Sequence, residues 1–293
     1  MKSLQGTVSM QKKDKVNSTV SSFQLPAKPQ VLTELQLEQS RPNPSMQVFS
    51  EIISKDVALS SSLLKTVNSP AFGLKRTVTD IKQSVIMIGY SGVTNIASFY
   101  QLQNSFKEKA AISLEKFWDT AMDTANMMSL LLENLSITLS CTKEDAYAFG
   151  LFRDCGIPLL AIKYTDYKEV LIEANSSPEQ EFTSFEDNRY ETSHATMGYY
   201  MAHSWNLPKN ICELILRHHE PDFLASSDSD ESQKELYALI KIAGNTLSQY
   251  KFAKDDCEWF LAKDHVLDFF AISEPDYQDI EDDLKEAFSV QFG

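Results

Sequence analysis

The sequence predicts an all-α fold, and two observations support that prediction. Apolar residues recur every three or four positions along most of the chain, which is the period of a helix with one buried face. An alternation of apolar and polar residues, the pattern of a half-buried strand, is nowhere sustained over five or six residues. With 293 residues, 43% of them hydrophobic, the chain can bury a large core in one domain or in two packed lobes.

Turn and capping residues divide the part from residue 23 to residue 110 into short helices. Serine and aspartate are preferred caps because their side chains accept hydrogen bonds from free backbone N–H groups of the first turn. Proline, glycine and asparagine mark helix ends and turns. Helices are therefore predicted to begin near Val31, after Ser45, after Asp56, at Asp80 and near Gly92, with breaks at Pro42-Asn-Pro44, from Asn68 to Gly73 and at Gly89. The preceding residues, 1–22, are polar and are expected to form a flexible tail.

The second half of the chain is also predicted to be helical. A long helix is expected from about Ser113 to Leu135, followed by one shorter helix on either side of Arg153-Asp154. Later helices are predicted over residues 191–205, 208–219, 233–250, 256–270 and 276–289. Residues 223–232 are acidic and rich in serine, so they are expected to form a loop that precedes a C-terminal helical extension, 233–293.

Charge and composition exclude several classes of function. The formal net charge of −14, from 41 acidic and 27 basic residues, opposes sequence-independent binding to nucleic acid, which depends on Lys and Arg. No apolar run reaches the roughly 20 residues that a membrane-spanning helix needs, and the N-terminus lacks the core of a signal peptide. The four cysteines, Cys141, Cys155, Cys212 and Cys257, show no Cys-x-x-Cys spacing. We expect a cytoplasmic protein with reduced cysteines that binds neither membranes nor nucleic acid.

Two sets of segments resemble one protein family. Residues 56–73 followed by 78–89 look like the signature of the HDOD family, the HD-related output domains of bacterial signalling, at Asp56, Leu63, Leu64, Asn68, Ser69, Gly73 and Gly89. The segments 117–121, 150–156, 194–198, 205–208 and 218–220 are similar in order and spacing to the HD-like half of that family. The resemblance covers roughly residues 23–222. It implies an N-terminal lobe of small helices, 23–110, an HD-like lobe, 111–222, and a C-terminal extension that packs on the HD-like lobe.

Local chemistry alone also explains part of this signature. Asp56 is explained as a helix cap, and Asn68 and Ser69 as turn residues. The alternative for Asn68 and Ser69 is that their loop forms part of a surface for a partner or a ligand.

The departures from the family pattern bear on the chemistry. The resemblance implies that an active HD enzyme holds one or two metals with a His, a His-Asp pair and a later Asp. Thr120 falls at the first of these positions, Arg153 at the second, and Gly244 or Asn245 at the last, so only Asp154 is kept. An arginine has no lone pair for a metal and carries a permanent positive charge. We therefore expect the HD metal site to be lost and no catalytic residue to remain.

Arg153 and three histidines are the remaining candidates for a site. Arg153 is expected to replace the positive charge of a metal and to pair with a buried carboxylate, Asp154 or Glu186. His194, His218 and His219 match positions where HDOD relatives also carry histidine. One interpretation is structural, because a histidine near a helix C-terminus can bond the last carbonyl groups. Residual weak binding of a metal or an anion is the alternative, and catalysis is a third.

These observations favour a non-catalytic regulatory output module of bacterial signal transduction that acts through protein–protein contacts and needs no cofactor. A metal-dependent phosphohydrolase with a rearranged site of Asp154, His194, His218 and His219 is the alternative. A second alternative is a sensor of a small ligand, such as a nucleotide, whose pocket lies where the metals of HD enzymes are bound.

Overall fold

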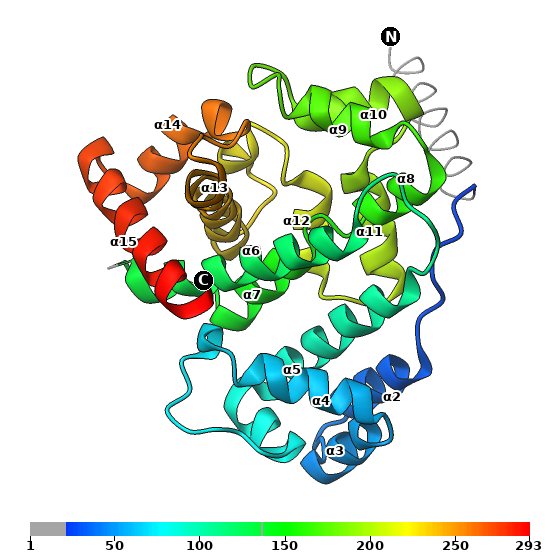
Figure 1. The fold of residues 1–293 in the computed structure, drawn as a ribbon. Coiled ribbons are helices and arrows are strands. Elements are labelled where there is room, and N and C mark those ends of the chain that lie inside the picture. The colour runs from blue at the N-terminus through cyan, green and yellow to red at the C-terminus, as the bar shows by residue number, and fades with distance from the viewer. Residues whose placement is uncertain (1–21, 136) are drawn as a thin grey trace.

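The computed structural model describes residues 22–135 and 137–293, and within these ranges every regular element is a helix. The predicted all-α fold is therefore confirmed. In Figure 1 the helices α2 to α5 lie together at one end of the molecule, and α13 lies among α6, α14 and α15. The expected tail, residues 1–22, lies outside the described residues except for Ser22.

The N-terminal lobe follows the predicted caps and breaks. Its elements are α2 (Gln30–Gln39), α3 (Met46–Ser54), α4 (Val57–Val67), the 3-10 helix η1 (Pro70–Phe72) and α5 (Ile81–Ser105). Ser45 accepts a hydrogen bond from the backbone N–H of Val48, and Asp56 accepts one from that of Leu59. Leu59, Leu63 and Val67 are buried along one side of α4, as the apolar period predicts. Leu64 is half-buried and packs against the same core.

The remaining family-signature residues shape the connections between these helices. The Asn68 side chain donates to the carbonyl groups of Leu64 and Val78 and accepts from the Val78 N–H, which closes the turn. Gly73 has a φ of 59° and ends η1. Gly89 has non-helical backbone angles, φ 69° and ψ 172°, so α5 consists of two helical segments that meet at a kink, and the predicted break is confirmed. Ser69 carries a buried hydroxyl that has no hydrogen-bond partner among residues 22–135 and 137–293.

The HD-like lobe comprises α6 (Leu114–Asn134), α7 (Lys143–Phe152), α8 (Ile157–Lys163), α9 (Tyr167–Ala174), α10 (Phe182–Tyr190), α11 (His194–Ser204), α12 (Lys209–Arg217) and the 3-10 helix η2 (Phe223–Ala225). The predicted helix over 191–205 begins too early. Glu191 has a φ of 58° and ends α10, and Ser193 caps α11 by accepting from the Thr196 N–H. Helices α9 and α10 were not predicted. The sequence of α10 carries little apolar periodicity, whereas α9 buries Tyr167, Val170 and Ala174 at helical spacing but has only eight residues.

The C-terminal extension consists of α13 (Glu231–Phe252), α14 (Trp259–Phe270) and α15 (Glu274–Phe292). Helices α13 and α15 both pack against α6 of the HD-like lobe. The buried Glu235 of α13 accepts hydrogen bonds from the backbone N–H groups of Ser140 and Cys141, which joins α13 to the loop before α7. The extension is therefore attached by polar as well as apolar contacts. None of the described helices combines the length and the apolar character required to cross a lipid bilayer.

Candidate functional site

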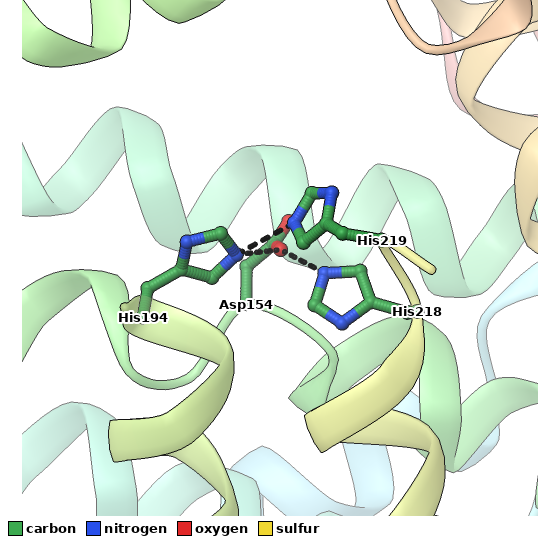
Figure 2. Close-up of side chains that lie close together, drawn as sticks. All are labelled: Asp154, His194, His218 and His219. Atoms are coloured by element: carbon green, nitrogen blue, oxygen red, sulfur yellow. Dashed lines mark hydrogen bonds and ion pairs between the residues drawn. The ribbon is translucent and has the colours of Figure 1, made fainter. Parts of the chain in front are cut away.

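Three separate connections bring four polar side chains to one place. Asp154 lies in the turn between α7 and α8, His194 is the first residue of α11, and His218 and His219 follow α12. The turn can approach α11 closely because residue 156 is glycine: a Cβ there would lie 2.0 Å from the carbonyl oxygen of His194. Figure 2 shows the three imidazoles grouped around the Asp154 carboxylate.

The four side chains direct one donor atom each toward a common centre. One ligand atom from each of Asp154, His194, His218 and His219 lies within 4.8 Å of all the others. The Nε2 atoms of His194 and His219 are 2.9 Å apart. Oδ1 of Asp154 is 3.5 Å from Nε2 of His194 and 3.3 Å from Nε2 of His218. The cluster is largely closed to solvent, with His194 and His218 at 0% exposure and His219 at 8%.

Each imidazole is oriented by a hydrogen bond at its other nitrogen. Nδ1 of His194 contacts both oxygens of the buried Glu186 carboxylate, at 2.9 and 2.8 Å. Nδ1 of His218 is 2.8 Å from the carbonyl oxygen of Ile215, and Nδ1 of His219 contacts the Glu258 carboxylate. Because these partners accept, each Nδ1 carries a proton, so a neutral ring presents a lone pair at Nε2. Metal-binding histidines are commonly held in this way.

The lone pairs inside the cluster face one another at short range. Burial lowers the pKa of His218 and holds that of His219 well below its usual value, so both rings are neutral at pH 7. Nε2 of His218 is buried, has no hydrogen-bond partner within the described residues, and faces the Asp154 carboxylate. Burial alone would lower the pKa of His194, but the carboxylates of Glu186 and Asp154 raise it to about 10. With that pKa, Nε2 of His194 carries a proton that it can donate to the lone pair of His219, and a cation at the centre would take the place of this proton.

The expected pairing of Arg153 is found with one of its two candidate partners. Nε of Arg153 lies 2.8 Å from Oδ2 of Asp154, whereas Glu186 bonds His194 and accepts a hydrogen bond from the Tyr167 hydroxyl. Burial alone would raise the pKa of Asp154, but the guanidinium and the histidines hold it well below its usual range. The Asp154 carboxylate therefore divides its two oxygens between Arg153 and the histidines.

The other positions that correspond to HD ligands supply no ligand atom to the histidine cluster. Thr120, Arg153 and Gly244 line one cavity on the far side of the Arg153–Asp154 pair. Asn245 instead donates to the Tyr277 hydroxyl and to Glu281, and its Oδ1 accepts the backbone N–H of Asp256. Gly244 rather than Asn245 is thus the residue of α13 that faces the former ligand position.

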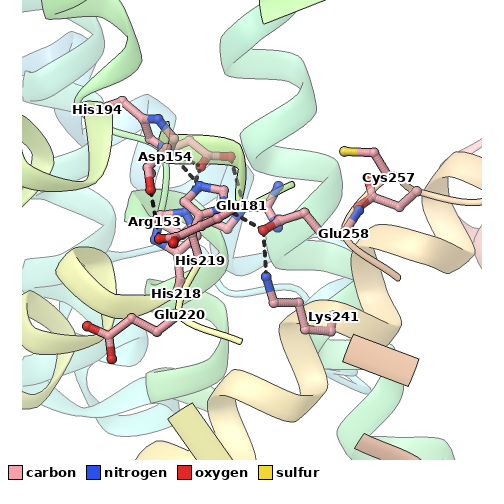
Figure 3. Close-up of polar contacts among 12 residues, drawn as sticks. Arg153, Asp154, Glu181, His194, His218, His219, Glu220, Lys241, Cys257 and Glu258 are labelled. Carbon is pink, nitrogen blue, oxygen red and sulfur yellow. Dashed lines mark hydrogen bonds and ion pairs between the residues drawn. The ribbon is translucent and has the colours of Figure 1, made fainter. Parts of the chain in front are cut away.

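Sequence reasoning missed two charged residues that complete the cluster. Glu258, before α14, contacts His219, and the buried Lys241 of α13 lies 2.9 Å from the same carboxylate (Figure 3). Burial would raise the pKa of Glu258, but the neighbouring His219 and Lys241 hold it well below its usual value. The sequence offered one indication of this pair: Lys241 lies between Ile240 and Ile242, which are both fully buried. A lysine in such an apolar stretch can indicate a buried, paired charge.

The donor set fits a divalent transition metal. Imidazole nitrogens with a carboxylate oxygen are typical ligands of zinc, iron and related ions. A metal ion binds histidine at a free ring nitrogen while the other ring nitrogen donates a hydrogen bond. His218 meets both conditions, because its Nε2 makes no hydrogen bond within the described residues and its Nδ1 donates to the Ile215 carbonyl. Asp154, His194, His218 and His219 would hold the ion, which would supply the positive charge that the facing lone pairs lack.

The helical fold and the histidine–aspartate cluster define a protein of the HD-related class. A model of the HDOD domain matches residues 25–221, and the chain belongs to the HDOD family. An uncharacterised protein of Treponema pallidum (strain Nichols) is 26% identical over 279 residues, which are 91% of this chain and 50% of that protein. The chain thus spans about half the length of this relative.

Solved structures share the fold at low sequence identity. An HDOD domain protein with unknown function from Geobacter sulfurreducens has a TM-score of 0.66 at 18% identity, covering 94% of this chain and 93% of that one. A protein named "Putative phosphohydrolase" from Shewanella amazonensis SB2B has a TM-score of 0.65 at 19% identity, covering 92% and 93%. A "Putative signal transduction protein" from Marinobacter aquaeolei VT8 has a TM-score of 0.68 at 18% identity, covering 95% of this chain and 64% of that one.

Proposed function

We propose that this protein is a non-catalytic regulatory module of signal transduction that acts through contacts with partner proteins. The observation that carries this proposal is the state of the HD ligand positions. Thr120, Arg153 and Gly244 offer neither an imidazole nor a carboxylate, and the retained Asp154 is bound at Oδ2 by Arg153. The name of the Marinobacter structure, a "Putative signal transduction protein", agrees with this role.

A metal-dependent phosphohydrolase is the second candidate, and the histidine cluster favours it. We propose that an ion held there has a structural role. An ion bound by all four side chains would already have a complete tetrahedral set, whereas catalytic zinc sites keep one position for water or substrate. The burial of all three imidazoles also leaves little access for a phosphoester.

Metal analysis and a hydrolysis assay together test this function. The converging donors of the histidine cluster replace the expectation of no cofactor: we now expect the purified protein to contain manganese, iron or zinc. A chromogenic phosphodiester should stay intact when manganese or nickel is added. Asp154→Ala should remove the metal, and Asp119→Ala, at an exposed aspartate of α6, is the matched control. Hydrolysis that disappears in Asp154→Ala but persists in Asp119→Ala would overturn the non-catalytic proposal.

The proposed contacts with partners need a separate experiment. The protein is used to capture partners from the lysate of its native host, with the metal-free Asp154→Ala variant in parallel. A regulatory module is expected to retain a specific protein through washing. Capture of no protein above the background of an unrelated helical protein would count against the proposal.

A further inference from the structure

The cavity beside Arg153 is lined by three of the positions that the resemblance assigns to HD ligands, and it has the size of a ligand site. Its volume is about 370 Å³, and Thr120 of α6, Arg153, and Gly244 and Ser248 of α13 contribute to its wall. A second cavity of about 310 Å³ shares Thr120 with the first and continues along α6. Pockets for small molecules commonly have volumes of about 300 to 1,000 Å³.

Arg153 lines this cavity, and its guanidinium is paired with a carboxylate at one nitrogen only. The Arg153 side chain is 19% exposed and uses Nε to bond Asp154. Its two terminal nitrogen groups, Nη1 and Nη2, donate no hydrogen bond to any residue within the described ranges. A Cβ at Gly244 would meet only Nη1, at 3.8 Å, so this end of the guanidinium borders open space. Nη1 and Nη2 together carry four N–H donors, and Nη1 lies beside Gly244 in the cavity wall; a guanidinium with free terminal groups can bind phosphate or carboxylate.

The remaining polar groups give this cavity a modest positive balance. Lys251 and Lys254 add two cations, of which Lys251 is paired with Asp123 at 2.6 Å. Asp255 and Asp256 add two carboxylates, but each accepts a hydrogen bond from a protein N–H, at 2.7 Å and 3.0 Å. With Arg153, three cations and two carboxylates line the cavity, a balance of +1 in a chain whose net charge is −14. Arg153 and Lys251 are each also paired with an aspartate outside this lining. Such a local excess of positive charge in an acidic protein favours an anionic ligand.

The second cavity suits the organic part of such a ligand. Phe117, Ala121 and Leu171 give it an apolar wall, to which Lys116 and Asp154 add one charge of each sign. The hydroxyls of Thr120 and Thr124 donate to backbone carbonyls of their own helix, so toward the cavity they present only acceptor lone pairs. Hydroxyl groups of a ligand could donate to them. The joined cavities therefore combine a cationic end, hydroxyl acceptors and an apolar end.

We propose that these joined cavities bind a small organic phosphate of the size of a nucleoside monophosphate. The phosphate contacts Arg153 and Ser248, and the nucleoside lies along α6 between Thr120 and Leu171. The hydroxyl of Ser248 is available as a donor, because it makes no hydrogen bond to any residue that the structure describes. The role of this ligand as an input signal rests on the proposed regulatory function. Its binding can be measured independently of that function.

Two substitutions at Gly244 test the site while leaving Arg153 and the histidine cluster unchanged. Gly244→Asp would place a carboxylate beside Nη1 of Arg153, where it neutralises the cation, and Gly244→Asn adds a side chain of the same size without charge. Binding of AMP, GMP, CMP and UMP is measured by isothermal titration calorimetry, with the matching nucleosides and inorganic phosphate as further probes. Thermal unfolding of both variants verifies that they fold.

We expect at least one monophosphate to bind at least about tenfold more tightly than its nucleoside, because the phosphate supplies charge-assisted hydrogen bonds. Gly244→Asp should weaken this binding at least about tenfold, and Gly244→Asn should weaken it by less than about threefold. Equal affinity for monophosphate and nucleoside, equal losses in both variants, or no binding at concentrations up to about 1 mM would each overturn the proposal.

The two proposals fail in different ways. Loss of phosphate binding with no hydrolysis removes this inference and leaves the regulatory function in place. Conversion of a bound monophosphate to its nucleoside would keep the binding site and remove the non-catalytic function.

Discussion

Replacement of Glu186 by alanine should be one of the most destabilising single changes in the HD-like lobe. The carboxylate is fully buried and accepts hydrogen bonds from the backbone N–H and the Nδ1–H of His194 and from the Tyr167 hydroxyl. His194 and Tyr167 are themselves at 0% exposure. Water therefore cannot replace the lost acceptor without opening the core.

The contacts set the magnitude of the expected loss. Each buried donor left without an acceptor costs about 1 to 3 kcal/mol, and Glu186→Ala leaves three of them. Removing one partner of a buried ion pair costs about 3 to 5 kcal/mol as a whole. We expect the free energy of unfolding to fall by about 3 to 5 kcal/mol, a large share of the roughly 5 to 15 kcal/mol typical of a folded domain.

Urea unfolding in the presence of a chelator measures this loss without a contribution from bound metal. Glu186→Gln is the matched variant: it keeps one acceptor oxygen and the side-chain volume, so its loss should be about 1 to 2 kcal/mol. If the alanine variant does not fold, the glutamine variant still tests the reasoning. A loss below about 1 kcal/mol for Glu186→Ala, with an unchanged dependence on urea, would refute it.

Three further outcomes follow from the structure. Gly156→Ala should unfold the protein or lower its melting temperature steeply, because the Cβ would meet His194 at 2.0 Å, whereas Gly244→Ala should stabilise it by about 0.5 to 1 kcal/mol in thermal melts. Burial and neighbouring carboxylates raise the pKa of Cys257 from 9.0 to about 12, so iodoacetamide at pH 8 should label it about a thousandfold more slowly than a free thiol; equal rates would contradict this. Glu258→Gln should weaken zinc binding about 10- to 100-fold, as measured by competition with a chromogenic chelator; unchanged affinity would show that Glu258 does not orient His219.

Much of the fold could be predicted from local chemistry. Ser45 and Asp56 cap their helices as expected, because a side chain that accepts from the first turn acts over only three residues. The start of α11 was predicted too early because Glu191 adopts a left-handed conformation, φ 58°. Glutamate rarely adopts this conformation, so the sequence gives no sign of it. The break at Gly89 could be predicted because glycine readily adopts the positive φ that interrupts a helix.

The candidate site was predicted only in part, because its geometry depends on contacts far apart in the sequence. The resemblance identified Asp154, His194, His218 and His219, but only the structure shows that their donor atoms converge. The sequence limited the partner of Arg153 to Asp154 or Glu186. It could not decide between them, because the distance to Glu186 depends on the tertiary fold. Glu258 could not be found, because it lies 39 residues after its partner His219 and belongs to no local pattern.

The contact between Glu258 and His219 crosses the C-terminal limit of the family match. The family match ends at residue 221, yet the carboxylate that orients one imidazole comes from residue 258. A gene fragment cut at residue 221 would retain all four donor side chains and lose a group that aims one of them. The family match and the contacts of the site therefore end at different residues. A domain expressed within the limits of the family match would lack the carboxylate that orients His219.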